Sequence, residues 1–300
     1  MSANVQSKPK DKSTSFVRWF FYRARGDSPF AQLLIHLFLI LACVVAVYPL
    51  VRIFTLSLGP VSKSFVDPFT IIPKDASPIN YIKLFGNKDF LQWVLNSLAI
   101  TVSVALVGLA LSATGAYAFS RWKFPGRAAA LVFLLTSQAI PAGMLLIPIY
   151  LMLARLGWTN SFKGLVLAYS VTAVPFSIWI LKGYYDTVPF DLEEAALIDG
   201  CSRLETFWRI ILPLSTPALA VVFLNNFMAA WSEFIVAYRI LTKPELLTWP
   251  LGLNALQGQF QTEWGMYAAG ALMITIPVLA LFLYSSKWLV SGLTLGSVKG

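Results

Sequence analysis

The sequence is poor in the groups on which soluble proteins depend. Only 12% of its 300 residues are charged, and it contains two cysteines and one histidine, whereas 57% of it is hydrophobic. A soluble domain carries about 25% charged residues, because its surface must meet water. The shortage of charge therefore excludes an ordinary soluble fold and favours a chain whose surface faces lipid.

Reactive groups are also scarce. Cys43 lies in an apolar run and Cys201 in a polar loop, so we expect no disulfide framework. His36 has no Cys, His or carboxylate neighbour in the sequence and is interpreted as an interfacial residue rather than a metal ligand. The sequence contains no nucleophile–base set, metal-ligand cluster or phosphate-binding glycine loop. We therefore predict no catalytic residue, metal or cofactor on this chain.

Long apolar stretches are what the sequence has instead. About 20 apolar residues cross the hydrocarbon core of a bilayer as a helix. A charge at the centre of such a helix costs about 2.5–3.5 kcal/mol, and these stretches carry almost none. The sequence thus predicts an all-α integral membrane protein with six transmembrane helices. The predicted spans are residues 33–51, 94–120, 128–153, 164–181, 210–232 and 264–286.

The net charge of +9 is concentrated in particular loops. Three cations, Arg121, Lys123 and Arg127, stand between the second and third spans, and six more lie in the first 27 residues. Cytoplasmic loops collect Lys and Arg, so both termini are predicted to be cytoplasmic. The cations are thereby explained by topology, and no nucleic-acid partner is expected. The predicted organisation is a basic cytoplasmic tail (1–29), a first span with a periplasmic loop (30–92), a transmembrane domain (93–287) and a cytoplasmic tail (288–300).

Prolines and polar side chains interrupt the predicted spans. Proline bends a helix by removing a hydrogen bond, so the prolines fit either a moving pathway or ordinary membrane helices. The polar side chains fit either a hydrophilic path or contacts between helices. Glu233, within about a turn of a span, has either a functional role or a structural pairing with Arg239. The prolines are Pro141, Pro148, Pro175, Pro213, Pro217 and Pro277, and the polar residues are Asn96, Gln138, Asn225 and Asn226.

The loop between the fourth and fifth spans, residues 186–209, is rich in acids. Asp191 with Glu194 and Ser202 with Glu205 both have the spacing of a capping box, which predicts two helix starts. Gly200 separates them, because glycine accepts the left-handed conformation that ends a helix. We expect a short helix, a tight turn and a second helix that enters the membrane.

The surfaces of these two helices differ. The second has apolar residues at positions i, i+3, i+4 and i+7, which form one stripe. The first is acidic and has small residues that leave room for another surface, so it is either a docking helix or a solvated surface helix. The stripe consists of Leu204, Phe207, Trp208 and Ile211, and the small residues are Ala195 and Ala196.

This loop resembles a known motif. The run E-A-A-L-I-D-G from Glu194 to Gly200, followed after nine residues by I-I-L-P ending at Pro213, is similar to the EAA motif of the membrane subunits of ATP-binding-cassette importers. The second to sixth spans resemble the type I importer permease domain. The sequence from Trp288 to Gly300 resembles the end of carbohydrate-uptake permeases of the MalG type. The resemblance covers nearly everything after residue 30.

The resemblance implies roles for three segments. The loop 186–209 would be a coupling helix in a groove of a cytoplasmic ATPase, where acids pair with ATPase cations, alanines permit close contact and the glycine makes the turn. The end of the chain would reach between two ATPase subunits, and the outer loop 248–259 would contact an external binding protein. The implied residues are Glu193, Glu194, Ala195, Ala196, Asp199 and Gly200 for coupling; Gly296, Ser297, Val298, Lys299 and Gly300 at the end; and Leu253, Asn254, Leu256 and Gln257 in the outer loop.

The function implied is that of a non-enzymatic permease subunit in a bacterial inner membrane. It would form a heterodimer with a second permease and work with an ATPase dimer, which binds ATP and Mg, and with a periplasmic or lipid-anchored sugar-binding protein. The substrate implied is maltose or a maltodextrin-like oligosaccharide, with another sugar or a polyol derivative as alternatives. No sugar site is assigned here, since MalG-type subunits leave most sugar contacts to their partner.

Two rival functions belong to other classes. An ion-gradient-driven secondary carrier places titratable residues near the bilayer midplane, and this sequence has none there. A structural membrane scaffold predicts that changes in residues 191–200 leave transport untouched.

Overall fold

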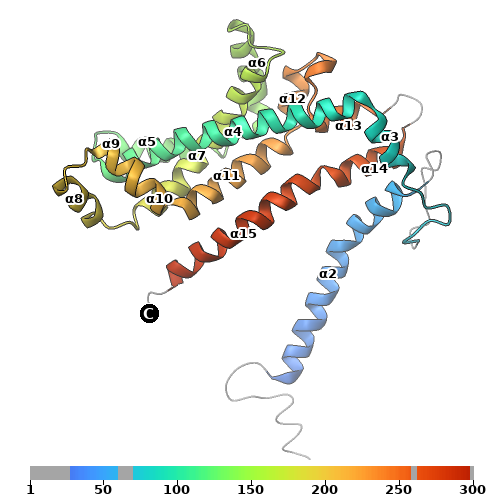
Figure 1. Ribbon diagram of the computed structural model, residues 1–300, viewed down its shortest axis with the longest axis horizontal. Coiled ribbons are helices and arrows are strands. Elements are labelled where there is room, and N and C mark those ends of the chain that lie inside the picture. Colours follow the sequence, from blue (N-terminus) through green and yellow to red (C-terminus); the bar gives the residue numbers. More distant parts are fainter. Residues whose placement is uncertain (1–27, 60–69, 258–261, 298–300) are drawn as a thin grey trace, which may run out of the picture.

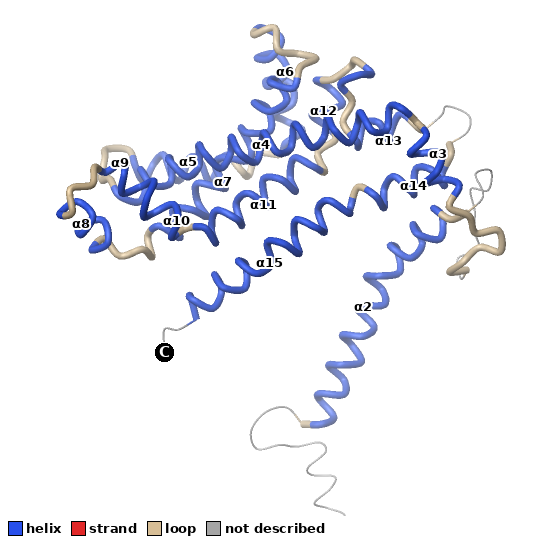
Figure 2. The backbone as a smooth tube through the Cα atoms, in the orientation of Figure 1, coloured by secondary structure: helices blue, strands red, loops and turns tan. Residues whose placement is uncertain are grey.

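The computed structural model describes residues 28–59, 70–257 and 262–297. Within these residues the regular secondary structure is helical, apart from one isolated bridge between Gln257 and Thr262, and loops join the helices (Figures 1 and 2). The longer helices are α2 (Pro29–Ser57), α4 (Lys88–Arg121), α5 (Arg127–Ser137), α6 (Ala142–Arg155), α7 (Phe162–Tyr185), α11 (Thr216–Trp231), α14 (Trp264–Met273) and α15 (Thr275–Ser297). The shorter ones are α3 (Ile79–Gly86), α8 (Asp191–Ile198), α9 (Arg203–Thr206), η1 (Phe207–Ile211), α10 (Leu212–Leu214), α12 (Ile235–Ile240), η2 (Pro244–Leu246) and α13 (Trp249–Ala255).

Polar caps start three of the long helices. The side chains of Ser28, Asn87 and Ser161 accept hydrogen bonds from backbone N–H groups in the first turns of α2, α4 and α7, at 3.2, 3.0 and 3.2 Å. Each cap satisfies an N–H group that has no partner within its helix. In each case the helix begins before the predicted span, by two residues in α7 and by more in α2 and α4, because the cap rather than the apolar run sets the start.

The core lies where α4, α7 and α11 pack on one another, with α15 against α11. Gly108 of α4 permits part of this contact, since a Cβ there would lie 2.8 Å from Asn226 Nδ2 of α11. Figure 1 shows α4 running along the whole length of this bundle, from the end that carries α3 and α13 to the end that carries α8 and α9. The two ends of α4 therefore lie beside two different sets of loops.

The prediction of six continuous spans is only partly met. Among the described residues, four helical segments are long and apolar enough to cross a membrane, namely α2, α4, α7 and α14 continued by α15. A fifth is a bent pair, Arg203–Leu214 with Thr216–Trp231, whose parts meet at 78°. The predicted third span is wrong as one helix, because it is divided into α5 and α6, of 11 and 14 residues.

Proline explains both interruptions. Pro141, with ψ of 131°, stands in extended backbone just before α6, and it has no N–H group with which to continue α5. Pro213 and Pro217 flank Ser215, where the fifth span bends. Pro148 and Pro175 instead remain inside α6 and α7. Pro141, Pro213 and Pro217 thus lie at or before the starts of helices. Pro148 and Pro175 lie within helices that continue past them.

Three of the polar residues in the spans make contacts between segments. The Asn96 amide donates to the carbonyls of Glu245 and Leu247, both at 2.9 Å. The other two join helix to helix: Gln138 to the carbonyl of Thr172 at 3.2 Å, and Asn226 to Ser177 at 3.0 Å. For these residues the structure favours contacts between segments over a hydrophilic path.

Glu233 has a structural partner, although not the predicted one. Its carboxylate accepts hydrogen bonds from Tyr169 Oη at 2.7 Å and from the backbone N–H of Val236 at 2.9 Å, at the start of α12. Arg239 instead lies over the ring of Tyr238, at 6.0 Å. The predicted pairing is therefore wrong, because the unpaired amides at the start of α12 are closer to the carboxylate.

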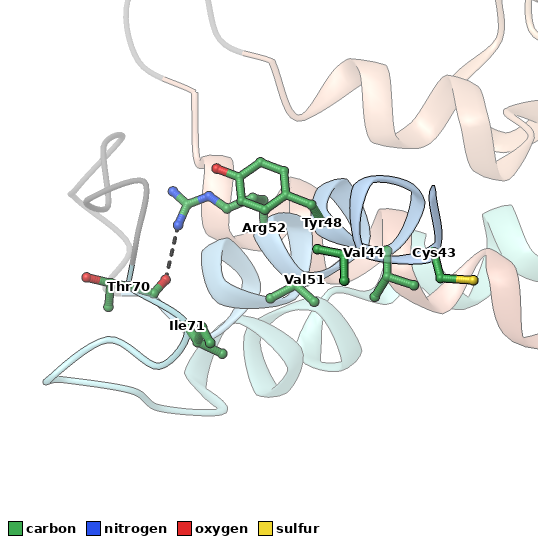
Figure 3. A pocket seen from close by; sticks show the side chains of 8 residues that line it. Cys43, Val44, Tyr48, Val51, Arg52, Thr70 and Ile71 are labelled. Atoms are coloured by element: carbon green, nitrogen blue, oxygen red, sulfur yellow. Dashed lines mark hydrogen bonds between the residues drawn. The ribbon is translucent and has the colours of Figure 1, made fainter. Parts of the chain in front are cut away.

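Helix α2 diverges from the bundle along most of its length (Figure 1). Its apolar side chains are exposed, Phe38 at 69% for example, as expected of a surface that meets lipid. Only its end near α14 and α3 is held, where Asn80 donates to the carbonyls of Ser57 and Gly59, both at 2.8 Å. A cavity of about 490 Å³ lies between α2 and the segment at Thr70, whose carbonyl accepts a hydrogen bond from Arg52 (Figure 3).

Candidate coupling site

Helix α8 begins with acids but without a capping box. Asp191, Glu193 and Glu194 all lie in its first turn, where carboxylates interact favourably with the helix dipole. The N-cap residue is Phe190, which makes no side-chain cap. The predicted box at Asp191 is therefore wrong, since Asp191 is already the first helical residue.

The turn after α8 is formed as predicted. Gly200 has a φ of +90°, in the left-handed region that favours glycine. The N–H of Gly200 donates to the carbonyl of Leu197 at 3.1 Å, and that of Cys201 donates to the carbonyl of Ala196 at 2.9 Å. These two bonds make a Schellman motif, which satisfies the last carbonyls of α8 and reverses the chain tightly.

The second capping box is confirmed. Ser202 Oγ accepts a hydrogen bond from the N–H of Glu205 at 3.3 Å, and Glu205 Oε2 accepts one from the N–H of Ser202 at 2.9 Å. The box fixes where α9 starts and hence the direction in which the chain leaves the turn.

The predicted apolar stripe is only half buried. Phe207 and Ile211 are 3% and 0% exposed, whereas Leu204 and Trp208 are 67% and 59% exposed. The turn from Phe207 to Ile211 is a π-helix, in which the N–H of Leu212 donates to the carbonyl of Phe207. Pro213 gives a reason for the wider turn, because its ring has no N–H and would clash with the carbonyl four residues earlier.

The inner side of α8 faces the end of α4. Glu193 Oε1 accepts a hydrogen bond from Arg121 Nε at 2.5 Å, and Glu193 Oε2 accepts one from Tyr117 Oη at 2.8 Å. The side chain of Ala196 is also buried. Glu193 is therefore paired within this chain and Ala196 packs inward, while the coupling roles implied for both residues stay predictions.

A second polar contact joins α4 to α7 beside this pair. Ser120 donates to Asp186 Oδ1 at 2.7 Å, and Lys182 pairs with the other oxygen of the same carboxylate. Burial would raise the pKa of Asp186, but the hydrogen bonds from Lys182 and Ser120 outweigh it, so the pKa lies below its ordinary value. The start of the loop is thus fixed by an ionised carboxylate.

Sequence reasoning missed Tyr117, Ser120 and Arg121 as site residues. From the sequence, Arg121 is predicted only to be one of the cations of a cytoplasmic loop. The available signal was the spacing: an aromatic hydroxyl and an arginine four residues apart lie on one face in the last turn of a long apolar helix.

The exposed side of α8 carries both apolar and acidic side chains. Ile198 is 86% exposed, and Leu192 and Leu197 are 42% and 40% exposed. The carboxylates of Glu194 and Asp199 are exposed as well. Exposed apolar side chains together with polar ones are typical of a surface that binds another protein. We call this exposed surface, made of Leu192, Glu194, Leu197, Ile198 and Asp199, the α8 outer face.

The other two predicted segments differ from each other. In the outer loop Leu253 is buried at 5% exposure, and its implied contact with a binding protein stays a prediction. Asn254 and Leu256 are half-buried and Gln257 is exposed. At the end of the chain α15 continues through Gly296 to Ser297, so the predicted tail is helical over residues 288–297. The predicted contacts at Val298, Lys299 and Gly300 lie outside the described residues.

The described ranges contain no cluster of three or more His, Cys, Asp or Glu side chains that could hold a metal ion. Between α4 and α9, α8 is a short helix held against the end of α4 by side-chain contacts.

Comparison with known proteins gives the class. The family model "Binding-protein-dependent transport system inner membrane component" matches residues 107–291, more than half of the chain. The chain therefore belongs to this family of transport permeases. In the solved structures, it is similar to a chain of a bacterial ABC transporter involved in the import of alginate, with a TM-score of 0.74, 21% identity, and coverage of 94% of this chain and 99% of that chain. At this identity the likeness concerns the fold.

Curated relatives extend over most of the chain. The galactooligosaccharides transport system permease protein GanQ of Bacillus subtilis is 39% identical over 88% of this chain and 94% of its own length. The maltodextrin transport system permease protein MdxG of the same species is 34% identical over 88% of this chain and 95% of its own. The maltose/maltodextrin permease MalG of Escherichia coli K12 is 38% identical over 70% of this chain and 73% of its own.

Proposed function

We propose that this chain is one half of the permease heterodimer of an ATP-driven sugar importer in a bacterial inner membrane. The α8 outer face is the observation that carries the proposal: it is a surface of exposed apolar and acidic side chains on a short helix, beside the end of the membrane bundle. Its docking partner would be a cytoplasmic ATPase that binds ATP and Mg, while this chain hydrolyses nothing itself. An external sugar-binding protein would dock at the opposite end.

The substrate we propose is a short oligosaccharide, with maltose or a maltodextrin first in order. The relatives named above are permeases for galactooligosaccharides, maltodextrin and maltose, and a further one, from Streptomyces coelicolor, is named for diacetylchitobiose at 33% identity. These sugars share a chain of two or more hexose units. No side chain is assigned to sugar contact, because the second permease is proposed to make most of those contacts.

Co-purification tests the docking proposal. The tagged chain is expressed with its own ATPase, second permease and binding protein, and is extracted in a mild detergent. We expect Glu194→Lys combined with Ile198→Asp to abolish capture of the ATPase while insertion and capture of the second permease persist. Asp75→Lys is the control, because it makes the same charge reversal as Glu194→Lys at an exposed acid near the opposite end of the bundle. A double variant that retains its ATPase would refute the docking role of α8.

Measurement of sugar uptake distinguishes an ATP-driven importer from an ion-gradient-driven carrier. In cells, depletion of ATP at a constant ion gradient should stop uptake of labelled maltotriose, whereas collapse of the gradient at constant ATP should not. The reverse pattern would identify an ion-driven carrier. Competition by maltose, galactobiose and diacetylchitobiose then ranks the sugars, and a failure of all three to compete would refute the proposed substrate class.

A further inference from the structure

The position of α8 depends on few side chains. Ala196 is the only buried side chain within this helix, and its tight turn connects it to α9 rather than to the bundle. A helix with so little apolar contact is free to tilt unless polar contacts hold it. Glu193 supplies such contacts, because both of its carboxylate oxygens are bound by side chains of α4.

Arg121 is at the centre of these contacts. In addition to Glu193, it donates from Nη2 to the carbonyl of Val188 at 3.0 Å and from Nη1 to Ser120 Oγ at 3.1 Å. Its guanidinium also lies 4.4 Å from the ring centroid of Phe190. Only 3% of the Arg121 side chain is exposed, so solvent screens these contacts little. One side chain therefore holds the segment before α8 and the first turn of α8 at once.

The far end of α4 holds another loop. Asn96 binds the carbonyls of Glu245 and Leu247, and Ser97 Oγ accepts a hydrogen bond from the N–H of Trp249 at 2.7 Å. A helix of 34 residues is about 50 Å long, and α4 is unbroken from Lys88 to Arg121. It is thus a continuous element that contacts both α8 and the outer loop.

We propose that Arg121 is the positioning residue that fixes α8 to α4, so that movement of the ATPase against α8 displaces α4 and, through it, the outer loop. This inference rests on the proposed function, since it requires α8 to dock on an ATPase. Without the Arg121–Glu193 contact, movement of the ATPase tilts α8 relative to α4. The displacement then stays within the loop 186–209 and does not reach α4. Docking then persists, whereas communication between the two ends fails.

The experiment measures communication separately from docking. In the assembled transporter in lipid nanodiscs, Arg121→Gln is expected to retain the ATPase and the second permease. The increase in ATP hydrolysis caused by sugar-loaded binding protein should fall by about tenfold, which lies in the usual range of coupling between sites. Lys123→Gln is the matched control, since it removes an exposed cation two residues away, and its stimulation should match the unaltered transporter.

Rescue distinguishes positioning from general damage. The exchange Arg121→Glu with Glu193→Arg restores opposite charges across the same contact, and it should recover most of the stimulation that either single change removes. Normal stimulation in Arg121→Gln, or an exchange no better than the single changes, would overturn the inference.

Two further results protect the test. If Arg121→Gln fails to assemble, Glu193→Gln replaces it, because it keeps the shape of the side chain and removes only its charge. Spin labels at positions 191 and 123, with both native cysteines replaced by serine, should give a broader distance distribution in the variant than in its parent. An unchanged distribution would also overturn the inference. If Arg121→Gln and Glu193→Gln both lose the ATPase while Lys123→Gln keeps it, the contact acts in docking rather than in communication. That result would also overturn the inference.

Discussion

Gly252 in α13 lies against the face of a tryptophan ring. A Cβ at this position would lie 1.9 Å from Trp93 Cδ2 and 2.2 Å from Trp93 Cε3. Trp93 cannot swing away easily, because it is only 5% exposed and its ring packs edge-on to Phe90 with centroids 6.5 Å apart. Replacement of Gly252 by alanine must therefore push α13 and α4 apart.

The expected cost follows from this overlap. Overpacking of a close-packed interior costs about 1–3 kcal/mol. Alanine recovers about 0.5–1 kcal/mol of this, because glycine is the poorer helix former. The difference between these terms is roughly 0–2.5 kcal/mol and is centred at about 1 kcal/mol. Each kcal/mol lowers the unfolding midpoint by about 2–4 °C in a chain of this size, so we expect a decrease of roughly 2–4 °C for Gly252→Ala.

Heating of the detergent-solubilised protein, followed by size-exclusion chromatography, measures this midpoint as the temperature that leaves half of the protein monodisperse. Gly183→Ala in α7 makes the same chemical change where nothing lies within 4 Å of the added Cβ, so its midpoint should be unchanged or slightly higher. Equal midpoints for the two variants would show that the contact between Gly252 and Trp93 is not tight, and the reasoning would fail.

Further outcomes follow from other contacts and are measured by the same heating assay unless stated. Ser202→Ala should cost about 1 kcal/mol by removing the cap of α9, with faster amide hydrogen exchange in that helix; unchanged exchange would contradict this. Glu233→Ala should cost about 1–3 kcal/mol, because the buried Tyr169 hydroxyl loses its acceptor; a midpoint equal to that of Arg239→Ala would contradict this. Asp186 stabilises the fold above its unfolded pKa of about 3.9, and this stabilisation is lost as the pH falls through its lower folded pKa. The midpoint of Asp186→Asn should therefore depend less on pH between about 5 and 2, and an unaltered pH dependence would contradict the assignment.

Local patterns predicted the local features well. Gly200 was placed correctly at the turn and Ser202 with Glu205 at a capping box, because both depend on residues within four positions of each other. The box at Asp191 was predicted from the same kind of spacing and was wrong. The helix starts one residue earlier than predicted, with Phe190 at the N-cap, so Asp191 is already helical.

The sequence predicted some membrane spans correctly and others incorrectly. The spans in α2, α4 and α7 follow from unbroken apolar runs, but the division of the third span at Pro141 and the 78° bend in the fifth do not. Hydropathy reports whether a segment prefers lipid, whereas the bend depends on what surrounds the proline. Pro175 is tolerated within α7 and Pro141 is not tolerated within a helix, and no difference in their local apolar character predicts this.

The sequence by itself determined that this chain is a helical membrane protein with an acidic, glycine-turned loop, because those properties depend on composition and on spacing between near neighbours. Only the tertiary structure decided that Glu193 faces inward to Arg121 and Tyr117 while Glu194 faces outward. The two glutamates are adjacent and chemically identical, so their roles differ only through the helix face on which each lies. Partners 72 and 76 positions away in the sequence are brought into contact by packing of α4 against α7, and packing is information that no local pattern contains.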